Sequence, residues 1–348
     1  MRFQECMEQG RTYIIAEMSA NHGGSFERAL DIIRAAKEVG ADCLKIQTFT
    51  PDTLTLDCDN EFFPPAATGL WKGLRSYELY QQAFTPWEWQ ADLKAECDRL
   101  GLDFLSSVFD PTSVDFLEGI GVEFYKIASP ELLDIPLLEK TAATGKPMIM
   151  SCGIATQEEI WDAVNACRAQ GNDQIYLLKC TSEYPTHFEQ MNLSLIPAMK
   201  EEFGCPIGLS DHSMDHLAAV VGVSLGACIV EKHFCITREV KTPDSTFSMN
   251  YEEFKAMVEA IRDVEKILGR AVFPQTPAEA RKPRQGRSLF SCAEIRKGEV
   301  FTAENVRSIR PGIGLKPKYY HDLIGRKALR DIPRGYPLEM SDLDGEKA

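Results

Sequence analysis

The sequence lacks the features that mark exported and membrane-inserted chains. Its first residues, Met1 to Cys6, contain no apolar h-region, so we expect no secretory signal. No run approaches the roughly 18 to 20 apolar residues that cross a bilayer. The 11 cysteines of the 348 residues include no CxxC pair and no framework spacing, which indicates reduced, mostly buried thiols. These absences predict a soluble, cytoplasmic protein that makes no membrane contact.

Positive charge is also scarce. The chain has 38 Lys or Arg against 52 Asp or Glu, and this net charge of -14 argues against nucleic acid as a partner. The deficit is uneven, because the segment from Arg281 to Arg334 has 14 basic and 5 acidic residues. Such a shift marks a domain boundary. We therefore expect a large domain over residues 1–270, a linker over 271–286 and a small domain over 287–348.

Short apolar runs alternate with amphipathic helical stretches through residue 269. The expected strands are Tyr13–Met18, Cys43–Thr48, Phe104–Val108, Phe124–Ala128, Met148–Cys152, Ile175–Cys180, Ile207–Ser210 and Cys228–His233. The expected helices include Phe26–Val39, Pro86–Leu100, Gln157–Ala169, Met191–Phe203, Asp215–Leu225 and Tyr251–Leu268. About eight βα units predict an α/β fold of the (β/α)8 TIM-barrel type. An open doubly wound sheet is the alternative, and the missing GxGxxG turn ranks it lower.

Polar side chains stand where each expected strand ends. In a TIM barrel the active site forms at these carboxyl ends. The residues are Glu17, Lys45 with Gln47, Ser107, Lys126 with Ser129, Ser151, Thr181 with Ser182, Ser210 with His212, and His233. Any chain becomes polar as it leaves a core, but eight such strand ends together favour a functional rim.

Two lysines, Lys45 and Lys126, lie inside otherwise apolar runs. A buried ammonium is costly unless it is paired. Two lysines among several serines predict a pocket for a small dianion that carries a phosphate and a carboxylate. The alternative is that each lysine pairs with a structural carboxylate such as Glu17 or Glu231.

Two histidines, His212 and His233, end consecutive expected strands, so they would converge at the barrel mouth. Two imidazoles with oxygen ligands suit Mn²⁺, Mg²⁺ or Co²⁺ better than a closed zinc site. A lone histidine is more often a satisfied polar group, but two at adjacent strand ends favour a metal. His22 lies on the first loop without an assigned role, and we interpret His216 as structural.

The segment from Pro51 to Phe84 is long for one βα loop. A loop of this length is usually functional, so we expect a lid or a helical excursion over the mouth. The alternative is an aromatic cluster that only packs.

Six motifs together resemble the sialic acid synthase family over about residues 10 to 343. They are Ala16-Glu17-Met18-Ser19-Ala20-Asn21-His22, Lys45-Ile46-Gln47-Thr48, Tyr125-Lys126-Ile127-Ala128-Ser129, Lys179-Cys180-Thr181-Ser182-Glu183-Tyr184-Pro185-Thr186, Gly208-Leu209-Ser210-Asp211-His212-Ser213 and Glu231-Lys232-His233-Phe234. The closer resemblance is to the branch that makes pseudaminic acid. N-acetylneuraminate synthases more often have Ile-Gly in place of Met18-Ser19 and Asn at the position of Ser182.

The resemblance implies a condensation of phosphoenolpyruvate with 2,4-diacetamido-2,4,6-trideoxy-L-altrose and water, giving a nine-carbon acid and phosphate. Neuraminate or legionaminate synthesis is the alternative. The C-terminal segment resembles the antifreeze-like (SAF) cap domain, which implies a domain-swapped homodimer. The implied roles are catalysis by Glu17, His212 and His233, with both histidines on the metal; phosphoenolpyruvate binding by Lys45, Ser107, Lys126, Ser129, Ser151, Ser182 and Ser210; and sugar binding by Gln47, Tyr184, Asp244 and Arg310.

Two other functions stay open at this point. A pyruvate aldolase would use Lys45 or Lys126 as a Schiff base. A non-catalytic carbohydrate-binding or ice-binding protein is suggested by the C-terminal segment alone, and the polar rim argues against it.

Overall fold

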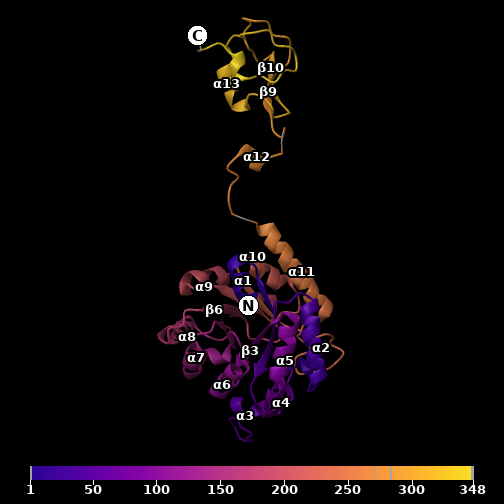
Figure 1. Cartoon of the computed structure of the whole chain (residues 1–348), viewed down its shortest axis with the longest axis vertical. Coiled ribbons are helices and arrows are strands. Elements are labelled where there is room, and N and C mark those ends of the chain that lie inside the picture. Colours follow the sequence, from indigo (N-terminus) through magenta and orange to yellow (C-terminus); the bar gives the residue numbers. More distant parts are fainter. Residues whose placement is uncertain (1, 270, 283, 346–348) are drawn as a thin grey trace. The chain divides into compact units, whose positions relative to one another are not determined.

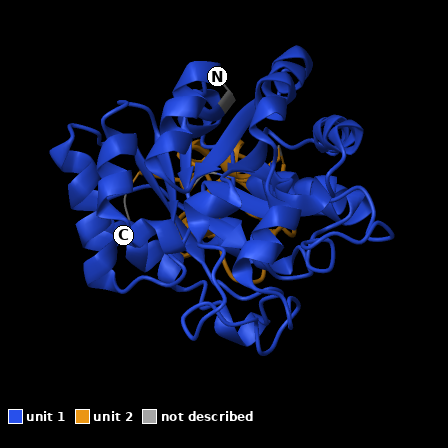
Figure 2. Cartoon of the chain, turned by 90° about the horizontal axis from the view of Figure 1, so that it is seen from below, with its two compact units in different colours: residues 1–269 blue, residues 270–348 orange. Residues whose placement is uncertain are grey.

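A computed structural model describes residues 2–269, 271–282 and 284–345. The chain divides into two compact units, Met1–Gly269 and Arg270–Ala348 (Figure 2, blue and orange). Residue 270 at the expected domain boundary, Pro283 in the expected linker and the last three residues lie outside the described residues.

Unit 1 is a closed barrel of eight parallel strands in the order β1 to β8, which confirms the predicted fold. Figure 1 shows the chain coloured along the sequence. Every strand bound lies within one residue of its expected position. The strands are β1 Tyr13–Glu17, β2 Cys43–Thr48, β3 Asp103–Val108, β4 Tyr125–Ile127, β5 Met148–Ser151, β6 Ile175–Cys180, β7 Ile207–Asp211 and β8 Ile229–His233. The barrel closes where β1 pairs with β8, with Glu17 opposite His233.

Helices surround the strands of unit 1 (Figure 2). They are α1 Arg2–Gln9, α2 Phe26–Glu38, α3 Pro51–Leu54, α4 Ser76–Ala83, α5 Trp87–Leu100, α6 Pro111–Ile120, α7 Ile135–Ala142, α8 Gln157–Ala169, α9 Leu195–Phe203, α10 Leu217–Ser224 and α11 Tyr251–Leu268, with 3-10 turns at Ser19–His22, Pro130–Leu133 and Phe188–Gln190. The helix expected from Met191 begins only at Leu195, because Asn192 adopts a left-handed backbone with φ 44°.

The amino end of the bore is filled with apolar side chains. Successive residues of a strand face opposite sides of a sheet, so alternate residues of each strand point into the bore. Helix α1, which the sequence analysis did not predict, closes this end. The Phe3 ring stacks on Phe124 at 5.2 Å and meets Tyr13 edge-on at 4.9 Å. The space for chemistry therefore lies at the carboxyl ends of the strands.

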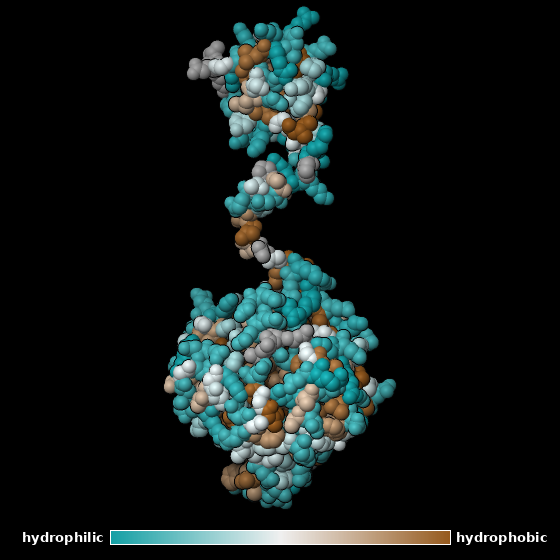
Figure 3. All heavy atoms as spheres, viewed as in Figure 1, coloured by the Kyte–Doolittle hydropathy of each residue, from teal (hydrophilic) through white to brown (hydrophobic). Residues whose placement is uncertain are grey.

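A larger apolar core lies between the strands and the helices, and includes Ile14, Leu44 and Val230. Hydrophilic residues cover much of the visible face of unit 1 in Figure 3. Within the part of the chain that the structure describes, no helix combines the length and the apolar character that crossing a membrane requires.

Unit 2 has its own small core, which includes Leu289, Phe301 and Leu338. Its strands β9 Ser288–Ser291 and β10 Val306–Ile309 pair antiparallel. Its short helices are α12 Pro277–Ala280 and α13 Tyr320–Leu323, with 3-10 turns at Pro317–Tyr319 and Met340–Asp342.

Candidate active site

The predicted lysines face the bore above its apolar layer. Lys45 and Lys126 are 3% and 2% exposed, and strand alternation directs both inward. Lys45 Nζ lies 2.5 Å from Glu17 Oε2 and donates to Ser107 Oγ at 3.2 Å. Lys126 Nζ donates to Ser151 Oγ at 2.7 Å. The lysines therefore stand among the serines, as an anion pocket requires.

Glu231, considered in the sequence analysis only as an alternative partner, lies between the two lysines. Its Oε1 is 3.5 Å from Lys45 Nζ and 3.6 Å from Lys126 Nζ, and it accepts from Ser210 Oγ at 3.5 Å. Its Oε2 is buried without a hydrogen-bond partner among the described residues. The alternative from the sequence, in which each lysine pairs with a carboxylate, is therefore also present in the structure. Strand alternation could have identified Glu231, because a residue two positions before His233 faces the same side of β8.

Burial and charge set unequal proton affinities in this cluster. Burial raises the pKa of Glu17 to about 7, although Lys45 opposes the shift. Burial also acts on Glu231, but Lys126 and Lys45 outweigh it and lower the pKa of Glu231. Burial lowers the pKa of Lys126, whereas Glu17 and Glu231 overcome burial and raise the pKa of Lys45. Burial thus favours the protonated form of Glu17 more than that of Glu231.

The half-buried Glu131 is a further carboxylate near Lys126 that the sequence analysis did not identify. Glu131 follows β4 in the Pro130–Leu133 turn, and its Oε2 lacks a hydrogen-bond partner among the described residues. Burial raises the pKa of Glu131 to about 7, against the opposing charge of Lys126. No sequence pattern separated this residue from an ordinary turn glutamate.

The remaining serines line the same end of the bore. Ser129 Oγ accepts from the backbone N–H of Gly153 at 2.9 Å and of Ile154 at 3.0 Å. Its hydroxyl proton is left to donate, which suits an anion. A Cβ at Gly153 would lie 2.9 Å from Ser129 Oγ and would also press on Ser182, so only glycine fits there. Ser182 Oγ lies 3.9 Å from Cys180 Sγ.

The two predicted metal ligands converge, with ring centroids 5.5 Å apart. His212 Nδ1 lies 2.9 Å from the Thr181 carbonyl oxygen, so Nδ1 carries the proton. Burial acts to lower the pKa of His212, but the hydrogen bond with the Cys180 side chain and the charge of that group outweigh burial and raise it, so a cation would have to displace this contact. His233 Nδ1 is buried without a partner among the described residues. Burial and the neighbouring His212 hold the pKa of His233 well below its usual value, which keeps this ring in the neutral, ligating form.

These donors fit a divalent cation, although they do not form a complete shell. Among the described residues, no group of three or more His, Cys, Asp or Glu stands ready to hold a metal ion. A cation on His212 and His233 would therefore take water or substrate oxygens as its further ligands.

Aromatic rings lie against His212 and His233. The Tyr184 ring lies 4.2 Å from His212 and 5.0 Å from Phe247. The long segment from Pro51 to Phe84 contributes Trp71, whose Nε1 donates to Pro243 O at 3.2 Å and whose ring lies 6.4 Å from Phe247. The segment contains α3 and α4, so the expected helical excursion is present, while its movement as a lid stays a prediction.

Three of the four expected sugar-binding residues border this mouth. Gln47 Nε2 donates to Glu17 Oε1 at 3.1 Å and to Ser19 Oγ at 3.0 Å. Asp244 is 8% exposed, and its Oδ2 accepts from the Ala20 N–H at 3.2 Å. Tyr184 packs on the histidines as described above. Arg310 is an exposed residue of unit 2 and is not among the groups that unit 1 brings together.

His22 has no assigned role, and our interpretation of His216 as structural stays a prediction. His22 is buried, its Nδ1 accepts from the Gly24 N–H at 3.1 Å, and burial lowers its pKa to about 4. His216 occupies the N-cap position of α10 without a side-chain capping hydrogen bond, and its Nδ1 lies 3.6 Å from Asp215 Oδ1.

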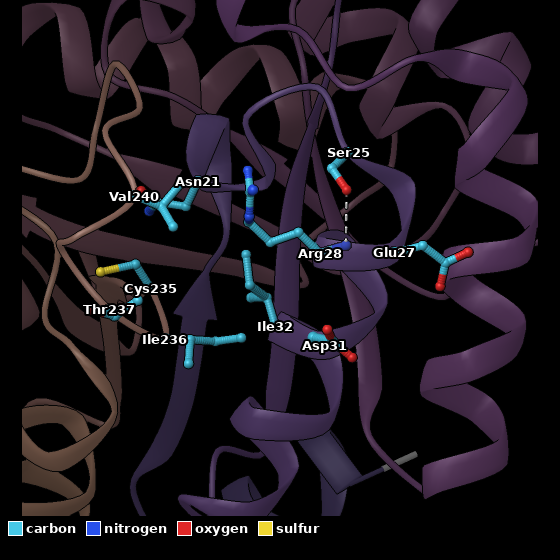
Figure 4. A pocket seen from close by; sticks show the side chains of 10 residues that line it. All are labelled: Asn21, Ser25, Glu27, Arg28, Asp31, Ile32, Cys235, Ile236, Thr237 and Val240. Carbon is cyan, nitrogen blue, oxygen red and sulfur yellow. Dashed lines mark hydrogen bonds between the residues drawn. The ribbon is translucent and has the colours of Figure 1, made fainter.

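A separate cavity of about 320 Å³ lies beside α2 and the loop after β8 (Figure 4). Arg28, Glu27 and Asp31 are among the residues that line it, so its charges are mixed, and the Glu27 carboxylate points away from Arg28 (Figure 4). None of the lysines or histidines of the mouth lines it. Asn21, which lines this cavity, donates from Nδ2 at 3.0 Å to the carbonyl oxygen of Phe234, the residue that follows His233.

Together the fold and the mouth define a (β/α)8-barrel protein in which buried lysines, carboxylates, serines and histidines gather at the carboxyl ends of the strands. The sequence model of the NeuB family matches residues 32–273, and that of the SAF domain matches residues 286–344. The chain belongs to the NeuB family, and its C-terminal unit carries a SAF domain.

The chain is similar over nearly its whole length to characterised relatives. It is 44% identical to the pseudaminic acid synthase of Campylobacter jejuni, over 95% of this chain and 96% of that one. It is 32% identical to the N,N'-diacetyllegionaminic acid synthase of Legionella pneumophila, over 94% and 93% of the two chains. The crystal structure of the spore coat polysaccharide biosynthesis protein SpsE of Bacillus subtilis matches with a TM-score of 0.64 and 33% identity, over 97% and 96%.

Proposed function

We propose that this chain is a pseudaminic acid synthase. It would condense phosphoenolpyruvate with 2,4-diacetamido-2,4,6-trideoxy-L-altrose and water, releasing phosphate. The observation that carries the proposal is the 44% identity to a relative of that name, against 32% to a legionaminic acid synthase. The mouth of paired lysines and serines supports the same chemistry.

Phosphoenolpyruvate would bind with its phosphate and carboxylate among Lys45, Lys126 and the serines. Each lysine already has a carboxylate neighbour, so the incoming dianion competes with Glu17 and Glu231 for the ammonium groups. Charge-assisted contacts of this type are shorter and stronger than neutral ones. The serine set is Ser107, Ser129, Ser151, Ser182 and Ser210.

In the reaction, the electron pair of the C2=C3 double bond of phosphoenolpyruvate would form a bond from C3 to the sugar aldehyde carbon. The π pair of the aldehyde C=O would move to its oxygen, which takes a proton to become a hydroxyl, and C2 would be left positive. Water adds to C2, and phosphate leaves with cleavage of the C–O bond. We assign the proton of this water to Glu17, whose carboxylate accepts from Gln47 Nε2 at the mouth and whose pKa is raised by burial. His212 and His233 would hold a divalent cation, Mn²⁺ or otherwise Mg²⁺ or Co²⁺, which would supply Lewis-acid polarisation of the aldehyde.

The sugar would be held by Gln47, Tyr184 and Asp244, and its N-acyl group by Arg310. We further propose that the chain is cytoplasmic and works as a domain-swapped homodimer, in which the SAF domain serves the partner's barrel.

The test is phosphate release from phosphoenolpyruvate with Mn²⁺, comparing the altrose derivative, N-acetylmannosamine and the legionaminic precursor. Release with the altrose derivative alone supports the proposal. Release with another sugar keeps the reaction and overturns the substrate. No release with any sugar, together with borohydride trapping of pyruvate on the protein, would replace the proposal with a Schiff-base aldolase.

A further inference from the structure

A buried ion pair lies directly behind the two mouth histidines. Asp211 precedes His212 on β7, and Lys232 precedes His233 on β8. Because strand side chains alternate, Asp211 and Lys232 point outward, away from the bore that Glu231 faces. The two residues stand opposite each other in the strand register and are 0% and 1% exposed.

This pair is fully hydrogen-bonded. Lys232 Nζ donates to Asp211 Oδ2 at 2.6 Å, to Ser213 Oγ at 3.2 Å and to the Asp215 carbonyl oxygen at 2.8 Å, which uses all three ammonium protons. Asp211 Oδ1 accepts from the Ser213 N–H at 2.8 Å. One lysine of β8 therefore fixes both the end of β7 and the turn that follows His212.

Stability alone does not account for an ion pair in this place. Both residues are buried, and the carboxylates of Asp215 and Glu253 also act on Lys232. Buried ion pairs are often no more stabilising than apolar side chains of similar volume, since desolvation offsets their attraction. The pair instead fixes a geometry, because its hydrogen bonds hold β7, β8 and the turn after β7 in one arrangement.

We propose that Asp211 and Lys232 are positioning residues for the cation site: they hold the His212 and His233 imidazoles at the separation that lets both bind one divalent cation. Neither residue touches the cation or the substrate. The inference rests on the metal-binding part of the proposed function.

The test is Mn²⁺ binding, measured by electron paramagnetic resonance of free Mn²⁺ on metal-stripped protein without substrate. The double variant Asp211→Asn/Lys232→Met removes both charges and leaves none unpaired. We expect its Kd for Mn²⁺ to rise about 10- to 100-fold, the range seen when groups that orient metal ligands are lost. Its thermal unfolding should stay close to that of the wild type, and its KM for phosphoenolpyruvate should change less than threefold.

The control is Arg262→Met, which removes a guanidinium 2.9 Å from the buried Asp42 at the amino end of the barrel. This variant should lose stability and keep its Mn²⁺ affinity. If the double variant does not fold, Ser213→Ala removes one acceptor of Lys232 and should still weaken Mn²⁺ binding about threefold.

The outcomes separate the two proposals. Wild-type protein that binds no Mn²⁺ overturns the cation site, and this inference with it. Wild-type protein that binds Mn²⁺, with folded variants that bind equally well, overturns the positioning role and leaves the proposed function intact.

Discussion

Replacement of Lys126 by Met tests the anion pocket most directly. Met preserves the length of the side chain and removes the ammonium that donates to Ser151 Oγ at 2.7 Å. Glu231 keeps Lys45 at 3.5 Å, so it is not left as an isolated buried charge. Since loss of a buried partner usually costs about 3 to 5 kcal/mol, the remaining lysine should limit the loss to about 1 to 3 kcal/mol. The variant should therefore fold well enough to assay.

The catalytic effect should be larger than the effect on folding. Loss of one preorganised donor to a developing charge typically costs about 2.7 to 4 kcal/mol, or about 100- to 1000-fold in rate. Lys126 is 2% exposed, so water cannot readily replace its ammonium at the bound phosphate or carboxylate. We expect kcat/KM for phosphoenolpyruvate to fall by this factor, while KM for the sugar changes little.

Steady-state phosphate release at saturating sugar and Mn²⁺ measures the effect. Lys179→Met is a matched control, because Lys179 is 8% exposed and lies on the outward face of β6. Its Nζ donates to the Cys180 carbonyl oxygen at 2.6 Å rather than into the bore. The control should keep kcat/KM within about threefold. A Lys126→Met enzyme that also stays within threefold would refute the anion pocket.

Three further predictions concern the cation, the sugar and the pH dependence of folding. Excess EDTA should abolish turnover and added Mn²⁺ should restore it; full activity in EDTA would remove the cation from the mechanism. Arg310→Ala should raise KM for the sugar at least tenfold and leave KM for phosphoenolpyruvate nearly unchanged; an unchanged sugar KM would contradict its role. The pKa of His22 is about 4 in the folded state and about 6.5 unfolded, so the unfolded state binds the proton first as pH falls. The contribution of His22 to the free energy of unfolding should be full above pH 6.5 and fall by about 3 kcal/mol between pH 6.5 and 4. Urea unfolding at both pH values should show a smaller loss of stability for His22→Gln than for the wild type. Equal losses in the two proteins would exclude His22 as the cause.

The sequence predicts the barrel well because its signal is local. Each strand is a short apolar run that ends in a polar residue, and lysines inside such runs, Lys45 and Lys126, stand out without any structure. The convergence of His212 and His233 follows from their places at the ends of neighbouring strands. These features need only periodicity and strand order.

Other features depend on contacts between distant segments. The sequence analysis did not predict helix α1, because eight residues give only a short hydrophobic pattern. The contacts of Phe3 with Tyr13 and Phe124, which close the bore, are known only from the structure. The position of Glu231 between two lysines depends on distances across the barrel, which no spacing along the chain reports. Trp71 reaches the wall of the mouth from a loop whose path the sequence leaves open.

Strand alternation alone directs the last three side chains of β8, Glu231, Lys232 and His233, to alternate faces of the sheet. Glu231 faces the two lysines, Lys232 faces Asp211 behind the sheet, and His233 returns to the mouth beside His212. A slip of one residue in the register would exchange these faces and place Lys232 in the bore with Glu231 and His233 outside. The buried Asp211–Lys232 pair opposes that slip, because a displaced Lys232 would leave the Asp211 carboxylate charged, buried and without its cation. The same pair that we propose to orient the histidines therefore also specifies the register that brings them to the mouth.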